Sequence, residues 1–82
     1  MQFKYINHSE IGFVLWARTD SVYHSHMAHT VCYNAGGEIV SAGFVTVVNG
    51  TVECYGMSES LNIESKKDDS VLLADQLGLD PA

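Results

Sequence analysis

The chain has 82 residues, of which 46% are hydrophobic and 17% charged, and this composition predicts one folded domain spanning residues 1–82. Four lysines and arginines stand against ten acidic residues, which gives a formal net charge of −6. Nucleic acids and anionic membranes bind concentrated cationic side chains. We therefore expect neither as a partner, and we expect no targeting or membrane-spanning segment.

The acidic charge is uneven along the chain. Residues 1–41 carry a formal charge of −1 and residues 42–82 carry −5. The acidic half is interpreted as a solvated surface, with a docking face for a basic partner as the alternative. Cys32 and Cys54 stand far apart, and they are interpreted as buried, reduced thiols rather than a disulfide or metal ligands. This pattern favours a cytoplasmic location.

Two strands are predicted near the N-terminus. Residues 2–6 alternate weakly between apolar and polar positions, which is typical of a short edge strand. Residues 11–17 are apolar on both faces and predict a central strand that is covered on both sides. A helix is expected next, over residues 21–34, with Thr19 or Asp20 as its N-cap.

The middle of the chain predicts a β-hairpin. Residues 44–48 and 51–55 form the arms, and Asn49-Gly50 provides the type I′ turn. Residues 38–42 are expected to lengthen the first arm, with Gly43 marking a bulge or a close backbone approach.

A second helix is expected near the C-terminus. Residues 65–68 fit a capping box, and Gly78 is expected to end the helix. Its apolar stripe is expected to comprise Val71, Leu72, Leu73 and Leu77. The order β-β-α-β-β-α predicts an α+β fold, a small mixed sheet with two packed helices and a core within residues 11–79.

Three of the four histidines, His24, His26 and His29, lie within six residues. In a helix His26 and His29 share a face, whereas in a strand His24 and His26 do. Neither geometry brings all three together, so they are only weak candidates for a metal site. We expect no cofactor. A single functional histidine and chance surface positions are the other interpretations.

Tyr55-Gly56-Met57-Ser58, preceded by a strand that starts at a glycine and followed by a leucine-containing acidic helix, resembles the phosphohistidine phosphatase and janus-type family. Upstream, an apolar strand followed by Tyr23-His24 is also similar to that family. The resemblance implies the family's fold, with His24 as the catalytic base. It also implies that Ser58 or nearby backbone amides hold the phosphoryl group.

The family's glycine segment continues into an arginine that this chain lacks. The segment aligns with residues 35–39 or with residues 41–45, so Glu38 or Phe44 takes the place of the arginine. We therefore expect a non-catalytic binding module for a protein or a small anionic ligand, with a phosphohistidine or phosphoramidate phosphohydrolase as the alternative.

The expected ligand-binding residues are Gly43, Ser58 and Arg18. His24 and Ser58 are expected to flank a shallow polar pocket that lacks a well-placed cation. Only Arg18 and Lys4 are available to assist, so phosphate is expected to bind no more tightly than in the millimolar range.

Overall fold

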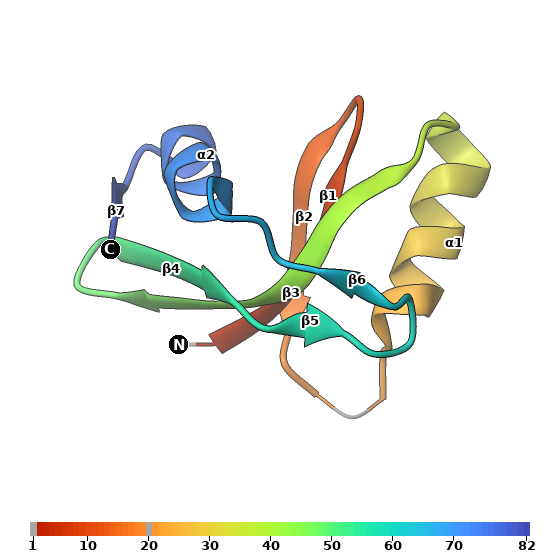
Figure 1. The fold of residues 1–82 in the computed structure, drawn as a ribbon, viewed down its shortest axis with the longest axis horizontal. Coiled ribbons are helices and arrows are strands. Elements are labelled where there is room, and N and C mark those ends of the chain that lie inside the picture. Colours follow the sequence, from red (N-terminus) through yellow and green to blue (C-terminus); the bar gives the residue numbers. More distant parts are fainter. Residues whose placement is uncertain (1, 20) are drawn as a thin grey trace.

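A computed structural model describes residues 2–19 and 21–82 (Figure 1). The predicted N-cap Asp20 lies outside the described residues. The elements, in chain order, are β1 (Gln2–His8), β2 (Gly12–Ala17), α1 (His24–Ala35), β3 (Ile39–Val48), β4 (Thr51–Tyr55), β5 (Met57–Ser58), β6 (Ile63–Glu64), α2 (Asp69–Leu77) and β7 (Asp80–Pro81).

Five of the strands form a mixed sheet in the order β2-β1-β3-β4-β7. The neighbouring pairs are antiparallel except β4 and β7, which are parallel. Strands β5 and β6 form a separate antiparallel pair. The predicted α+β class, a small mixed sheet with two helices, is confirmed.

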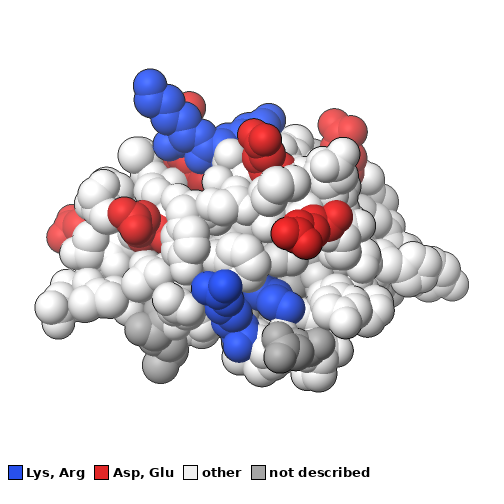
Figure 2. All heavy atoms as spheres, turned by 60° about the horizontal axis from the view of Figure 1, so that its bottom comes forward, with Lys and Arg blue, Asp and Glu red and all other residues white. Residues whose placement is uncertain are grey.

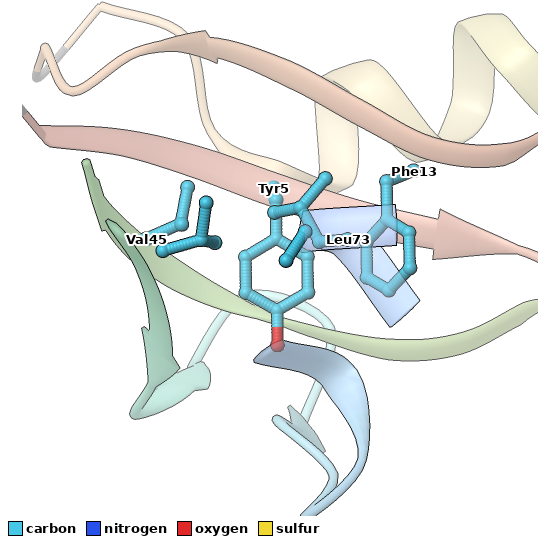
Figure 3. Close-up of a cluster of buried hydrophobic side chains, with 6 residues drawn as sticks. Tyr5, Phe13, Val45 and Leu73 are labelled. Carbon is cyan, nitrogen blue, oxygen red and sulfur yellow. The ribbon is translucent and has the colours of Figure 1, made fainter. Parts of the chain in front are cut away.

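The two helices lie apart, with strands of the sheet between them (Figure 1). Side chains alternate across a strand, so β1, β2 and β3 each contribute to two cores, one on either face of the sheet. Leu73 and Ala74 of α2 pack in one core with Tyr5 and Val45, whereas Ala28 of α1 packs in the other. Figure 3 shows the Tyr5 ring among Val45, Leu73 and Phe13. The core therefore begins in β1, upstream of the expected residues 11–79.

The predicted positions of the first two strands are exchanged. Strand β1 lies between β2 and β3, and β2 is the edge strand. The prediction that β1 is an edge strand was based on its weak alternation and was wrong, because both of its faces are covered and even the Lys4 side chain is only 8% exposed. The prediction that β2 is apolar on both faces holds, since Phe13 faces the α2 core and Val14 the α1 core.

The outer edge of β2 is partly occupied by a side chain of α2. The Gln76 amide accepts a hydrogen bond from the Phe13 N–H at 3.0 Å and donates one to the Phe13 carbonyl at 3.1 Å. These two bonds imitate the pairing that a neighbouring strand would provide. Gln76 therefore joins α2 to the sheet and covers part of an otherwise unpaired edge.

The first helix and the hairpin follow their predicted turn residues. Helix α1 starts three residues later than expected, with Tyr23 as its N-cap, and Gly36 ends it at a φ of 71°. Asn49 and Gly50 have φ values of 51° and 76°, as a type I′ turn requires. The predicted extension of the first hairpin arm is also confirmed, since β3 is continuous through Gly43.

The predicted start of the second helix is wrong. The Ser65 hydroxyl donates to the Gly56 carbonyl and caps no helix. Helix α2 instead begins at Asp69, whose buried carboxylate accepts a hydrogen bond from the Lys66 N–H at 2.8 Å. The C-terminal prediction is confirmed, because Gly78 ends α2 in a left-handed conformation and Leu79 packs against the core.

The predicted apolar stripe of α2 is only partly correct. Leu73 is fully buried, but Val71 and Leu72 are 56% and 52% exposed. Asp69 and Leu73 share a helix face at a spacing of four residues, and both point to the sheet. Because Asp69 is anchored in the core, the helix turns Val71 and Leu72 toward solvent.

Candidate functional site

One row of side chains crosses the sheet on the face covered by α1. Lys4 of β1 is directly opposite Trp16 of β2 and Phe44 of β3, and Phe44 is opposite Tyr55 of β4. Directly paired residues project to the same face, so the row places a lysine between aromatic rings. A pocket of about 470 Å³ lies on this row, lined by Lys4, Tyr23, His24, Phe44, Met57, Glu59 and Ser60.

The first residue of α1 places an imidazole over this row. The His24 ring makes edge contacts with Trp16 and Phe44, at ring-centre distances of 5.5 and 5.4 Å. Its Nε2 lies 2.7 Å from the Gly43 carbonyl oxygen, which only accepts, so Nε2 carries the proton. In the neutral ring Nδ1 is then the unprotonated nitrogen. His24 is thus held in one tautomer.

Burial of the ring lowers the pKa of His24 below its usual value, and the nearby Lys4 ammonium lowers it further. The hydrogen bond to Gly43 opposes these effects but does not outweigh them. His24 is therefore neutral at physiological pH, and it can accept a proton in that state.

Lys4 is the cation of the pocket. Its ammonium donates a hydrogen bond to the Val22 carbonyl at 3.0 Å and lies 5.6 Å from the centre of the Tyr23 ring. Within residues 2–19 and 21–82 it forms no ion pair with a carboxylate. Taking an ammonium out of water is costly unless opposite charge compensates it. A nearly buried lysine without an acidic partner is therefore suited to an anionic ligand.

The β5–β6 hairpin supplies another part of the pocket lining, through Met57 of β5 and through Glu59 and Ser60 of the turn. The Ser60 hydroxyl accepts a hydrogen bond from the Ser25 N–H at 3.2 Å, which joins this turn to the first turn of α1. The turn thus lies beside the start of α1 (Figure 1). The Glu59 side chain is exposed and has no ion-pair partner in the described part of the chain.

Arg18 lies beside the pocket rather than in its lining. Its guanidinium stacks on Phe44 at 4.1 Å from the ring centre and donates hydrogen bonds to Gln2 and the Tyr55 hydroxyl. Phe44 therefore contacts both Arg18 and His24. On the face drawn in Figure 2 the basic side chains form two separate groups, with acidic side chains between them, and no broad basic surface is present there.

The structure brings together some of the predicted site residues. Gly43 is next to Phe44 and binds His24 through its carbonyl. Ser58 lies in the sequence between two lining residues, Met57 and Glu59, but it does not line the pocket. It is fully buried, and its hydroxyl accepts a hydrogen bond from the Leu61 N–H at 3.1 Å. Ser58 therefore holds the β5–β6 turn, whereas Ser60 lines the pocket.

The expectation of a pocket without a well-placed cation was wrong, because Lys4 lines it. Sequence reasoning also missed Tyr23, Glu59 and Ser60 as lining residues. The period-2 pattern of β1 places Lys4 on the same face as Ile6, which is fully buried in the structure. No sequence signal shows that the β5–β6 turn folds back to the start of α1.

The other clustered histidines lie away from His24. His26 and His29 are exposed, and their rings contact Tyr23 and Tyr33 respectively. His26 also accepts a hydrogen bond from the Tyr23 N–H at the start of the helix. Across the described residues, no group of three or more histidine, cysteine or acidic side chains is arranged to hold a metal ion.

The lowered pKa of His24 predicts acid sensitivity of the fold. Well above pH 6.5 the ring is neutral in both the folded and the unfolded chain, and its contribution to stability is fully present. Below pH 6.5 the unfolded chain binds a proton on this ring more readily than the folded chain does, which favours unfolding. The contribution of His24 to stability is therefore lost as the pH falls through the folded-state pKa. Urea unfolding of the wild type and of His24→Gln from pH 7.5 to 4.5 measures this. The wild type should lose more stability over this range than the variant; equal losses would contradict the assignment.

Comparison with protein-family models, with curated proteins and with solved structures found no match to this chain. Neither helix α1 nor helix α2, both within the described residues, has the length and apolar character needed to cross a membrane.

Proposed function

We propose that this protein is a non-catalytic binding module whose pocket takes a small organic anion with an aromatic or apolar body. The observation that carries the proposal is Lys4, nearly buried in the pocket without an acidic partner among the described residues. A carboxylate bound there would supply the missing opposite charge and accept charge-assisted hydrogen bonds.

The remaining pocket lining supports a ligand that is mainly apolar. Tyr23, Phe44 and Met57 offer aromatic and thioether surface, and the neutral His24 adds no charge. Such a pocket, with a few convergent polar groups, is typical of small-molecule sites. The net charge of −6 opposes a doubly charged ligand more than a singly charged one.

The proposal is tested with 3-phenylpropionate and its uncharged amide, using NMR titration of the wild type and Lys4→Met. Methionine keeps much of the apolar stem and removes the charge. We expect the acid to bind more tightly than the amide, and Lys4→Met to weaken acid binding about tenfold or more, as the loss of a charged hydrogen bond implies.

Lys67→Met is the matched control, because it removes a lysine that does not line the pocket. Its affinity for the acid should equal that of the wild type. Equal affinity of the wild type for acid and amide would overturn the proposal, and this comparison does not depend on whether Lys4→Met folds.

A phosphohydrolase acting on phosphohistidine or a related phosphoramidate is the alternative. It is supported by a neutral His24, able to act as a general base, in the same pocket as the Lys4 cation. Turnover of a phosphohistidine peptide that disappears in His24→Ala would favour it. Phosphate binding at micromolar concentration would also favour it, whereas binding in the millimolar range agrees with the binding module.

We also propose a relationship to the phosphohistidine phosphatase and janus-type family. It rests on Tyr23-His24, on residues 55–58 and on a sheet flanked by two helices. A cytoplasmic location is proposed from Cys32 and Cys54, which are both free thiols, although they are half-buried rather than buried as predicted. We therefore expect a reducing agent to leave the free energy of unfolding unchanged.

A further inference from the structure

Two opposite charges line the pocket without neutralising each other. Lys4 lies on the sheet and Glu59 on the β5–β6 turn, and they form no ion pair. Within the described chain neither side chain pairs with any other charged group. The pocket therefore offers one cationic and one anionic contact at separate places.

Among the described residues, no third charged side chain lines the pocket. His24 is neutral because burial lowers its pKa, and Arg18 is stacked on Phe44 outside the lining. A ligand that is only anionic would meet Lys4 favourably and Glu59 unfavourably, since like charges repel at short range. A ligand with both charges would meet each with its opposite.

We propose that the ligand is a zwitterion, an amino acid or amino-carboxylate with an aromatic or apolar body, and this rests on the binding function proposed above. Its carboxylate pairs with Lys4 and its ammonium with Glu59. Its body lies against Phe44, Tyr23 and Met57. The aromatic rings also favour the ammonium, through their negatively polarised faces.

The experiment compares two zwitterions with acids of the same skeleton that lack the amine. L-phenylalanine is paired with 3-phenylpropionate, and 4-aminomethylbenzoate with 4-methylbenzoate, so that two charge spacings are covered. NMR titration of the wild type should show at least one zwitterion binding about fivefold or more tightly than its acid.

Glu59→Gln keeps the shape of the side chain and removes its charge. We expect this variant to lose the advantage of the zwitterion and to bind the simple acid more tightly than the wild type, because a repelling negative charge is removed. Glu64→Gln on β6 is the matched control, and it should leave both affinities unchanged.

The failures of the two proposals are distinguishable. If both simple acids bind and neither zwitterion binds more tightly, the zwitterion inference is overturned and the anion-binding function stands. The same holds if Glu59→Gln retains the full advantage. If none of the four compounds binds, both proposals are overturned.

Discussion

Replacement of Gly43 by alanine is expected to lower the free energy of unfolding by about 2–4 kcal/mol, more than most single methyl additions. A Cβ at this position would lie 2.5 Å from the Tyr55 carbonyl oxygen and 3.4 Å from the Gly56 carbonyl carbon. Both atoms belong to the backbone, which cannot move aside as a flexible side chain can. Strands β3 and β4 would have to separate locally.

The same substitution should disturb the pocket, because the Gly43 carbonyl holds His24. Urea unfolding measures the stability, and the His24 imidazole resonances report the ring. Thr46→Ala, three residues further along β3, is the control and should cost less than about 1 kcal/mol. A Gly43→Ala variant as stable as this control would show that the strands approach less closely than described.

Replacement of Asp69 by alanine is expected to lower the free energy of unfolding by about 3–5 kcal/mol, because it leaves several buried donors without an acceptor. The Asp69 carboxylate accepts hydrogen bonds from the Tyr5 hydroxyl at 2.5 Å, the Ser41 hydroxyl at 3.0 Å and the Lys66 N–H. It therefore joins α2 to β1 and β3. Its negative charge is also favourable at the start of a helix.

The pKa values of two side chains near Asp69, Tyr5 and Cys54, are raised. Burial and the Asp69 hydrogen bond raise the pKa of Tyr5, and burial together with the Asp69 charge raises the pKa of Cys54 to about 11. Asp68→Ala is the matched control, because the exposed Asp68 side chain makes no cap hydrogen bond. Thermal and urea unfolding compare the two variants. Equal, small losses would mean that the buried carboxylate contributes little.

The sequence by itself determined the elements whose signals are local. The type I′ turn at Asn49-Gly50 needs positive φ angles that these residues tolerate, and Gly78 ends α2 for the same reason. The two-sided apolar pattern of β2 and the α+β class follow from period and order alone. Gly43 was predicted to mark either a bulge or a close backbone approach, and the structure shows the close approach, to the Tyr55 carbonyl.

Only the tertiary structure decided which strands are central and which residues form the pocket. Lys4 is a charged residue of β1, yet its side chain is only 8% exposed, and its ammonium contacts the Val22 carbonyl and the Tyr23 ring. The second helix does not start after Ser65 as predicted, because the buried Asp69 sets its start. The Asp69 carboxylate accepts charge-assisted hydrogen bonds from Tyr5 and Ser41, which are far from it in the chain. Lys4 and Glu59 are 55 residues apart in numbering, and no local pattern relates them. Long-range packing of β1, α1 and the β5–β6 turn brings them into one pocket, because side-chain burial depends on neighbours that local sequence does not specify.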